Sequence, residues 1–215
     1  MFNSYTAILD YDCGNTESIQ NALRVVGQNS VITSDKFKIK NASSLILPGV
    51  GAFPAAMAKL QEKDLIEPVG RFIDSGKPLL GICLGMQLLM ESSSEFEETK
   101  GLTIINGKVV PLKSLIDSNS NRRVPNIGWY KIIVQDNSSL KNLLSGTIQD
   151  DYFYFVHSFA CKPTTINETL ATTEFGDTSF CSVYVKDNVS GVQFHPEKSG
   201  KSGLKVLKNF VDLKV

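Results

Sequence analysis

The chain has 215 residues, of which 42% are hydrophobic and 20% are charged, a balance typical of one globular α/β domain. Its 22 Lys and Arg residues equal its 22 Asp and Glu residues, so the net charge gives no reason to expect nucleic acid or an anionic membrane as a partner. The N-terminal segment lacks a signal-peptide pattern, and no apolar run approaches the ~20 residues of a membrane span. We therefore expect a cytoplasmic protein with free thiols at its four cysteines, Cys13, Cys83, Cys161 and Cys181.

Short apolar segments alternate with helical patterns in the first 91 residues. The segments expected to form strands are 6–11, 44–49 and 77–83, and those expected to form helices are 16–27, 53–76 and 84–91. Gly27 is expected to end the first helix, and Pro68 is expected to interrupt the second. This alternation favours a mostly parallel central sheet with helices on both faces.

The second half of the chain has a different residue composition. Segments rich in β-branched and aromatic residues predict antiparallel or mixed strands added to the core, at 101–112, 123–135, 151–162, 168–176 and 179–187. Residues 112–123 include a Ser/Asn/Asp run and are expected to form an exposed loop. Residues 189–197 return to a strand, and 199–213 predict a closing amphipathic helix. No repeat or linker divides the chain, so we expect one domain over residues 1–215.

One cysteine, Cys83, lies between two glycines at the junction of a predicted strand and a predicted helix. In GICLGMQ, residues 81–87, Gly81 and Gly85 leave room for a sharp turn, as in the G-x-S-x-G nucleophile elbow. Such a turn presents Cys83 at the carboxyl edge of the sheet, and the N-terminus of the following helix favours the reactive thiolate. A buried cysteine in a tightly packed turn is the structural alternative, and the motif alone leaves both open.

Two histidines, His157 and His195, could act as the base that a cysteine nucleophile needs. His195 precedes Pro196, which keeps the chain extended, so Glu197 faces the same side and can orient the imidazole. Cys83, His195 and Glu197 thus form a candidate triad. His157 lies in an aromatic segment, where we expect it to be structural or to line a substrate site. A surface histidine before a turn is the alternative for His195.

Acyl transfer also needs hydrogen-bond donors for the oxyanion. The backbone N–H of Leu84, just after the nucleophile, is one candidate. The PGVG turn at 48–51, which contains Val50 and Gly51, is a second source. Loss of one such donor typically costs about 2.7–4 kcal/mol of transition-state stabilisation. An ordinary strand-to-helix turn is the alternative interpretation of PGVG.

Three segments together resemble the class I, or triad-type, glutamine amidotransferases: LPGVGAF at 47–53, GICLGMQLL at 81–89 and GVQFHPEKS at 191–199. Within this superfamily, three further segments are most similar to the glutaminase subunits of imidazole glycerol phosphate synthase: DYDCGN at 10–15, PNIGWY at 125–130 and HPEKS at 195–199. The resemblance covers nearly the whole chain. It implies a flavodoxin-like α/β fold in which a mostly parallel central sheet carries an added mixed or antiparallel β section.

The resemblance implies a specific reaction. Cys83 attacks the side-chain amide of L-glutamine, His195 protonates the departing ammonia, and water then hydrolyses the thioester while Glu197 holds the imidazole. The implied oxyanion-hole residues are Val50, Gly51 and Leu84. The implied glutamine-binding residues are Gln87, Glu95, His157, Ser158 and Phe159, with Glu95 at the α-ammonium group and the backbone of 157–159 at the α-carboxylate. The sequence has no metal-site spacing, and no cofactor or metal is expected.

In the enzymes it resembles, ammonia passes to a (β/α)₈-barrel synthase subunit. That heterodimer makes imidazole glycerol phosphate and an aminoimidazole carboxamide ribotide in histidine biosynthesis. Channelling is needed because released ammonia would become ammonium near neutral pH and lose its nucleophilicity. The residues implied at the interface are Asn15, Trp129, Tyr154 and Lys198. Docking is expected to activate the glutaminase by turning the Val50 peptide so that its N–H enters the oxyanion hole.

The sequence departs from the family pattern at four single positions and in the 112–123 loop, which looks extended. Asp12, Asn126, Tyr130 and Phe159 stand where glycine, histidine, asparagine and tyrosine are usual. The first three lie in motifs near the expected docking face, so they bear on the partner more than on the chemistry. A glutaminase that supplies ammonia for amidination of a surface sugar is one alternative, and a stand-alone cysteine hydrolase of γ-glutamyl substrates is a second. A non-catalytic scaffold is disfavoured because all three triad residues are present.

Overall fold

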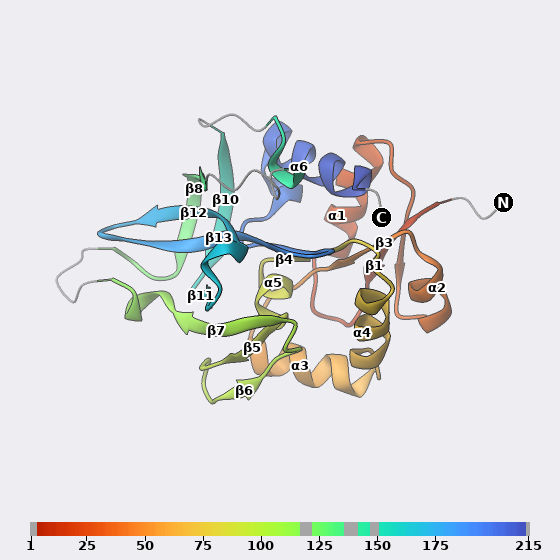
Figure 1. Cartoon of the computed structure of the whole chain (residues 1–215), viewed down its shortest axis with the longest axis horizontal. Helices are drawn as coiled ribbons and strands as arrows, with labels where there is room; N and C mark the ends of the chain where they lie inside the picture. Colours follow the sequence, from red (N-terminus) through yellow and green to blue (C-terminus); the bar gives the residue numbers. More distant parts are fainter. Residues whose placement is uncertain (1–3, 117–121, 136–141, 147–150, 214–215) are drawn as a thin grey trace.

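The computed structural model describes residues 4–116, 122–135, 142–146 and 151–213. Within them, a mixed sheet of eight strands crosses the molecule (Figure 1). In spatial order its strands are β2 (Ser30–Thr33), β1 (Thr6–Leu9), β3 (Ser44–Leu47), β4 (Leu79–Ile82), β14 (Val189–Val192), β13 (Thr178–Lys186), β12 (Thr169–Phe175) and β9 (Ile133–Val134). The first five strands run parallel to their neighbours, and the pairs from β14 to β9 are antiparallel. The expected α/β class, a mostly parallel core with an added antiparallel section, is confirmed.

Helices cover the parallel half of this sheet and two smaller sheets lie beside its antiparallel half (Figure 1). The helices are α1 (Thr16–Val25), α2 (Lys36–Asn41), α3 (Phe53–Glu62), α4 (Ile66–Asp74), α5 (Leu84–Leu88) and α6 (Gly200–Asp212), with 3₁₀ turns at Leu112–Ser114, Ile166–Glu168 and Pro196–Lys198. One small sheet pairs β10 (Tyr152–His157) with β8 (Asn126–Lys131). The other contains, in order, β11 (Phe159–Pro163), β7 (Ile105–Pro111), β5 (Met90–Ser93) and β6 (Thr99–Lys100).

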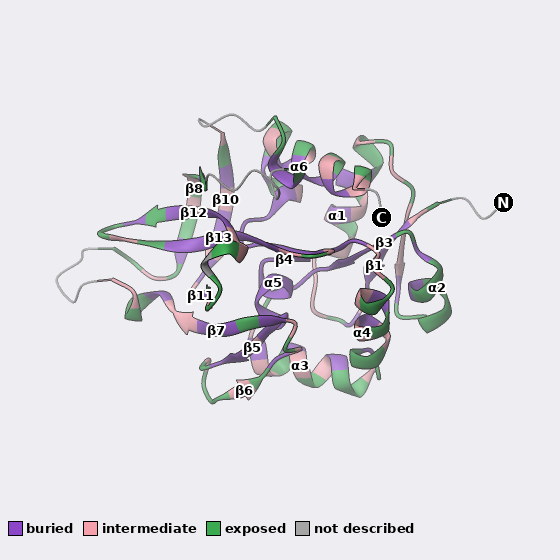
Figure 2. Ribbon diagram, viewed as in Figure 1, coloured by how far each residue is buried: buried purple, intermediate pink, exposed green. Residues whose placement is uncertain are grey.

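The central strands are buried on both faces, which explains why they read as continuous apolar runs. In β1, Ile8 packs into the core beneath α1 and α6, whereas Ala7 and Leu9 pack into the core beneath α3 and α4. Figure 2 shows the strands buried between helices whose outer faces are exposed. None of the helices in the described ranges is long and apolar enough to cross a membrane. All four cysteines are free thiols.

The structure corrects several element boundaries in the first half. The edge strand β2 and the helix α2 were not expected, because four and six residues carry too little periodic signal. The expected break near Pro68 is present, but Pro68 does not cause it. The chain leaves the helix at residues 63–65, where Asp64 has φ +53°, and Pro68 lies in the first turn of α4, where its missing N–H costs no helical hydrogen bond. Gly27 is confirmed as the end of the first helix: it follows the cap residue and has φ +79°.

Two further differences concern the neighbourhood of Cys83 and the aromatic segment. The helix expected over 84–91 ends at Leu88, because the following residues pair with β7 as strand β5. The single strand expected over 151–162 is divided at Ser158 into β10 and β11, which belong to different sheets. The strand expected over 189–197 ends at Val192. Of the loop expected over 112–123, residues 117–121 lie outside the described residues.

A close approach between α5 and β3 predicts a strong effect of one glycine substitution. A Cβ added at Gly85 would lie 1.9 Å from the Leu47 carbonyl oxygen, which belongs to a buried strand and cannot move aside cheaply. We expect Gly85→Ala to lower the free energy of unfolding by about 3 kcal/mol or more, measured by urea denaturation. Gly70→Ala is the matched control: its Cβ would meet nothing within 4 Å in α4, so it should gain up to about 1 kcal/mol. Equal stability of the two variants would contradict this packing argument.

Candidate active site

Cys83 occupies a sharp turn between β4 and α5. Its backbone has φ +54° and ψ −111°, a conformation that residues with a side chain rarely adopt, as expected for a nucleophile elbow. The Cys83 N–H donates to the Val192 carbonyl at 2.8 Å, which ties the turn to the neighbouring strand β14. The strained turn is thus held from two sides, by β14 and by the approach of Gly85 to β3.

A cavity of about 270 Å³ opens at this turn. Its lining residues are Val50, Gly51, Cys83, Leu84, Gln87, Glu95, Pro125, Val156, His157, Ser158, Phe159 and His195. The structure therefore brings together the predicted nucleophile, the predicted base, and every residue predicted for the oxyanion hole and for glutamine. Pro125 and Val156 were not predicted, because an apolar residue at a strand carries no chemical signal.

His195 and Glu197 form a buried pair beside the cavity. The imidazole Nδ1 and the carboxylate Oε1 lie 2.8 Å apart, and both side chains are almost fully buried. Glu197 lies in a 3₁₀ turn that begins at Pro196, immediately after the extended residue His195. The His195 N–H donates to the Tyr154 carbonyl at 2.9 Å, which fixes the turn against β10. Within the described part of the chain, Nε2 of His195 has no hydrogen-bond partner.

The surroundings of His195 favour its charged form. Burial lowers its pKa, but interactions with the Cys83 sulfur and with Glu197 outweigh that effect and raise the pKa to about 10. Near neutral pH, His195 therefore carries a proton beside the Cys83 sulfur. This arrangement can stabilise a thiolate and can supply a proton to a leaving group.

His157 has a different electrostatic state from His195. Its Nδ1 lies 2.8 Å from the Phe159 carbonyl, and its Nε2 lies 3.1 Å from Nδ2 of Asn126. Burial lowers its pKa to about 4, the charge of His195 acts in the same direction, and the hydrogen bond to Phe159 opposes both. A neutral, doubly hydrogen-bonded imidazole lines the cavity without acting as a base near neutral pH.

The two candidate oxyanion donors, Leu84 and Val50, differ in whether their N–H groups are already hydrogen-bonded. Leu84 is the first residue of α5, so its N–H has no acceptor within the helix. The Val50 N–H instead donates to the Cys13 carbonyl at 3.1 Å. Gly51, which follows, has φ +97°, a conformation that glycine adopts without strain.

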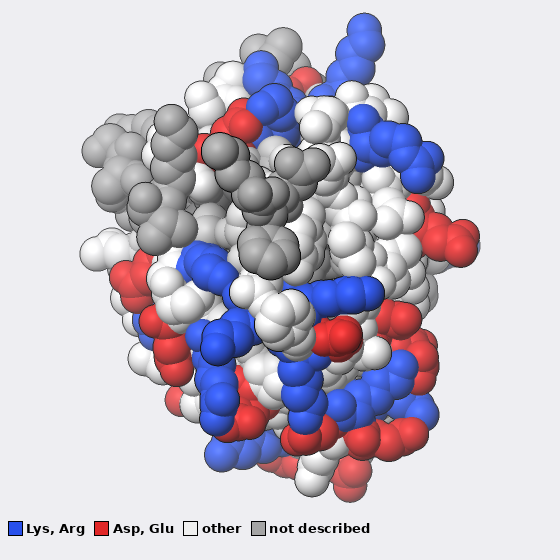
Figure 3. Space-filling view, turned by 90° about the vertical axis from the view of Figure 1, so that its right-hand side faces the viewer, with Lys and Arg blue, Asp and Glu red and all other residues white. Residues whose placement is uncertain are grey.

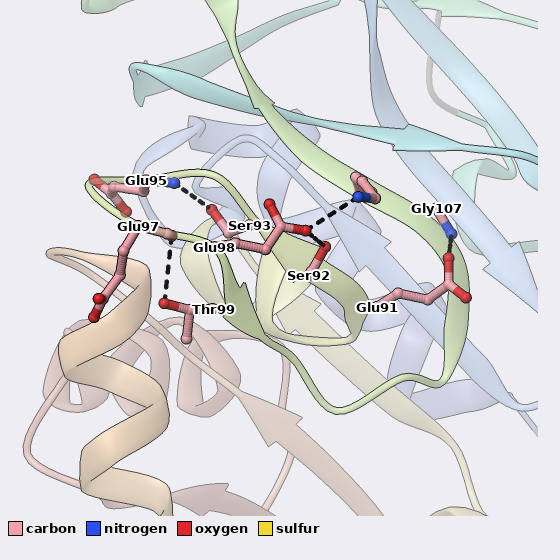
Figure 4. A network of polar contacts seen from close by, with 9 residues as sticks. Glu91, Ser92, Ser93, Glu95, Glu97, Glu98, Thr99 and Gly107 are labelled. Carbon is pink, nitrogen blue, oxygen red and sulfur yellow. Dashed lines mark hydrogen bonds and ion pairs between the residues drawn. The ribbon is translucent and has the colours of Figure 1, made fainter.

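Glu95 reaches the cavity from the connection between β5 and β6. Its backbone N–H donates to Ser93 Oγ at 3.2 Å, and its Oε2 accepts from the Phe53 N–H at 2.7 Å, at the start of α3. Figure 4 shows the surrounding contacts, in which Glu98 accepts from Ser92 at 2.8 Å and pairs with Lys108 at 3.0 Å. The contacts of Glu95 with Ser93 and Phe53 hold it where it lines the cavity.

Three of the four predicted interface residues lie together on the surface. Trp129 and Tyr154 face each other across β8 and β10 with ring centroids 5.8 Å apart, and Lys198 Nζ lies 6.0 Å from the Tyr154 ring. Ile127 and Trp129 are 56% and 51% exposed on the same strand. The fourth residue, Asn15, precedes α1, and α1 packs against the 3₁₀ turn that carries Lys198.

The departures from the family pattern have distinct structural settings. Asp12 has φ +66°, which explains why glycine suits this position, and its carboxylate pairs with Lys63 at 2.7 Å. Tyr130 packs edge-on against Phe155. Asn126 does not lie on the exposed docking face: it is 1% exposed and contacts His157 instead.

A second cavity of about 440 Å³ lies between α2 and α4. Three of its cations are engaged by neighbouring groups. Lys36 pairs with Asp64, Arg71 pairs with Glu67, and Lys77 donates to the Lys40 and Ala42 carbonyls at 2.7 and 3.0 Å. Figure 3 shows this side of the molecule, where basic and acidic side chains are interleaved. Among the residues that the structure describes, no group of three or more His, Cys, Asp or Glu side chains could hold a metal ion.

The lowered pKa of His157 predicts an acid-sensitive fold. Below pH 6.5 the unfolded chain takes up a proton that the native imidazole does not accept until about pH 4, so stability falls across this window by about 3 kcal/mol. Below pH 6.5 His195 adds little slope, because its raised pKa keeps it protonated in the native state and its ordinary pKa of about 6.5 keeps it protonated in the unfolded chain. Urea denaturation between pH 4 and 7 measures the effect. His157→Asn should remove most of the histidine contribution, and an identical pH profile in that variant would contradict the assignment.

Comparisons with known proteins agree with this geometry. The family model described as glutamine amidotransferase class-I matches residues 7–213. Imidazole glycerol phosphate synthase subunit HisH of Caldanaerobacter subterraneus subsp. tengcongensis is 45% identical over 207 residues, covering 96% of this chain and 97% of that protein. The HisH subunit of Lactococcus lactis subsp. lactis is 43% identical over 206 residues, covering 95% and 96%.

Solved structures share the fold at low sequence identity. The structure of PurLQS from Thermotoga maritima has a TM-score of 0.72 at 18% identity and covers 97% of this chain and 98% of that chain. A glutamine amidotransferase from Thermotoga maritima has a TM-score of 0.61 at 15% identity, covering 99% and 84%. From its match over residues 7–213 and its similarity to HisH subunits along nearly its whole length, the chain belongs to the class-I glutamine amidotransferase family.

Proposed function

We propose that residues 1–215 form a single glutamine amidotransferase domain. It hydrolyses L-glutamine to glutamate and ammonia as the glutaminase subunit of an imidazole glycerol phosphate synthase in histidine biosynthesis. The observation that carries this proposal is the buried His195–Glu197 pair at 2.8 Å, next to Cys83 and in contact with one cavity. The relatives named HisH, at 43–45% identity, support the choice of pathway. Free thiols at all four cysteines fit the cytoplasm as its compartment.

The residues at the cavity account for each step of the reaction. The Cys83 sulfur attacks the amide carbon of glutamine, and the C–N bond breaks as His195 passes its proton to the departing ammonia. A water molecule then attacks the thioester carbonyl while His195 takes its proton, and the thiolate leaves with glutamate formed. Glu197 keeps Nδ1 of His195 engaged, so that Nε2 faces the reacting atoms.

Two backbone N–H groups form the oxyanion hole, and only one of them is available before the partner docks. The Leu84 N–H is available in the present structure, whereas the Val50 N–H is bonded to Cys13. Rotation of the Gly49–Val50 peptide breaks that bond and delivers the second donor, next to the flexible Gly51. Val50 is 45% exposed, so a docked partner can act on it directly. This rotation is our explanation of how docking activates the glutaminase.

The substrate is held at both ends of its amino-acid part. Glu95 pairs with the α-ammonium group, and the backbone of His157, Ser158 and Phe159 binds the α-carboxylate. Gln87, on α5, donates to the Phe159 carbonyl at 2.9 Å, and all of these residues line the cavity.

The partner is a (β/α)₈-barrel synthase subunit that receives the ammonia and forms a heterodimer with this chain. Trp129, Tyr154 and Lys198 form its docking surface, with Asn15 at the adjoining end of α1. Exposed aromatic and apolar side chains beside a cation are typical of an interface core. Because His195 bonds to the Tyr154 carbonyl, this surface is directly continuous with the catalytic base.

Removal of the nucleophile tests the proposed chemistry. We expect Cys83→Ala, in complex with the barrel subunit, to lose glutamine-dependent activity by at least about 10³-fold while synthase activity with added ammonium salt persists. Cys181→Ala, which changes a buried thiol in β13, is the control and should keep both activities. Release of glutamate and synthase product measure the two reactions. Retained glutaminase turnover in Cys83→Ala would refute the mechanism.

The acceptor can be tested with the same protein. Synthesis of imidazole glycerol phosphate with the barrel subunit supports the histidine pathway. Turnover only with a sugar-amidinating enzyme, or turnover of γ-glutamyl peptides without any partner, would assign the chain to one of the two alternatives.

The docking surface predicts a selective loss of binding. Trp129→Ala removes a large exposed aromatic side chain at its centre and should weaken binding of the barrel subunit by about 10-fold or more, measured by calorimetry. Ile133→Ala, on β9 and 43% exposed, is the control and should bind normally. Unchanged affinity in Trp129→Ala would place the interface elsewhere.

A further inference from the structure

A continuous chain of buried hydrogen bonds leads to the sulfur of Cys83. Gln193, which is 0% exposed, is its last member, and its Nε2 lies 3.7 Å from Sγ of Cys83. Gln193 Oε1 lies 3.0 Å from Nε2 of Gln87, and that same nitrogen lies 2.9 Å from the Phe159 carbonyl. The Phe159 carbonyl also contacts Nδ1 of His157 at 2.8 Å. None of the roles proposed above involves Gln193.

One carbonyl sets the direction of this chain. The Phe159 oxygen can only accept, so the atom of Gln87 that faces it must be the amide nitrogen. A nitrogen on Gln87 requires an oxygen on Gln193 opposite it, which leaves the amide nitrogen of Gln193 facing the sulfur. The Phe159 carbonyl therefore fixes the orientation of the Gln87 amide, and the Gln87 amide fixes that of Gln193.

The register of the sheet places Gln193 beside Cys83. Strands β4 and β14 are parallel and pair Ile82 with Val192, so the next residues along the two strands, Cys83 and Gln193, lie side by side. The backbone fixes both positions: the Cys83 N–H donates to Val192, and the Gln193 N–H donates to the Ser182 carbonyl at 2.9 Å. The contact with sulfur thus belongs to the parallel core of the fold.

The neighbours of the Cys83 sulfur favour different forms of it. The charged His195 imidazole favours the thiolate, and the titratable groups of Tyr11 and Cys161 also lie within electrostatic range. The Val156 carbonyl lies 3.9 Å away and can accept only from the neutral S–H form. The Gln193 N–H can donate to the thiolate, and its burial keeps water from competing for the bond. A hydrogen bond to an ionised acceptor is about twice as strong as one between neutral groups. Gln193 consequently favours the form of Cys83 that attacks glutamine.

We propose that Gln193 is a catalytic residue that stabilises the Cys83 thiolate through its side-chain N–H, and that Gln87 is a positioning residue that orients the Gln193 amide. The inference rests on the proposed role of Cys83 as the nucleophile. It gives Gln87 a function in addition to contact with glutamine, and it assigns a function to the glutamine that precedes the Phe-His-Pro-Glu segment.

The pH dependence of Cys83 alkylation tests this inference. Iodoacetamide modifies the thiolate, and mass spectrometry of the Cys83 peptide separates it from the other three cysteines. Gln193→Leu keeps a similar volume without a donor, so the midpoint of Cys83 alkylation should rise by about one pH unit. In complex with the barrel subunit, kcat for glutamine should fall about 10-fold at neutral pH, with KM nearly unchanged and with partial recovery at higher pH.

Matched variants separate this effect from simple disturbance of the core. Ser182 holds the Gln193 backbone through its carbonyl, and its buried hydroxyl has no hydrogen-bond partner among the residues that the structure describes. Ser182→Ala removes that hydroxyl and should leave the alkylation midpoint unchanged. Gln87→Met keeps Gln193 but frees its amide, so the midpoint should rise by a smaller amount. This second variant decides the matter if Gln193→Leu fails to fold.

The outcomes distinguish the inference from the proposed function. A folded Gln193→Leu with the wild-type alkylation midpoint overturns the inference, as does a midpoint shift of the same size in Ser182→Ala. The proposed function survives either result provided that Cys83→Ala abolishes glutaminase turnover. Retained turnover in Cys83→Ala would instead overturn the proposed function, and the inference with it.

Discussion

The close approach of α5 to β3, which the missing side chain of Gly85 permits, holds Cys83 in its strained conformation. The Leu47 carbonyl occupies the space where a Cβ would lie, so the chain must turn at once from β4 into α5. The cost of φ +54° at Cys83 is offset by packing of Leu84, Met86 and Leu88 into the apolar core beneath α3. As a result, Cys83 lies just beyond the end of β4 and lines the cavity.

The remaining parts of the site converge because parallel strands end at one edge of the sheet. β3 delivers the PGVG turn, β4 delivers Cys83, and β14 delivers Gln193 followed by His195 and Glu197. The other side of the cavity is lined by His157, Ser158 and Phe159, where the chain passes from β10 to β11. The residues that line the cavity therefore come from different sheets.

The two histidines of the cavity are held in opposite protonation states. His195 is kept in its charged form by a carboxylate and a sulfur, whereas His157 is kept neutral by burial. The neutral His157 donates its Nδ1–H to the Phe159 carbonyl. The same carbonyl orients the amide of Gln87, and Gln87 in turn orients that of Gln193. Neighbouring elements thus give one cavity both a proton donor and a neutral lining group.

The sequence by itself determined the local features: the elbow at Cys83, the His195–Glu197 pair two residues apart in an extended segment, and the alternation that gives the parallel core. These depend on neighbours within a few residues, which periodicity and turn chemistry describe. Only the tertiary structure decided that α5 ends at Leu88, that β10 and β11 separate at Ser158, that Val50 bonds to Cys13, and that Gln193 meets the sulfur. Each of these depends on pairing or packing with distant residues, whose register no local pattern contains.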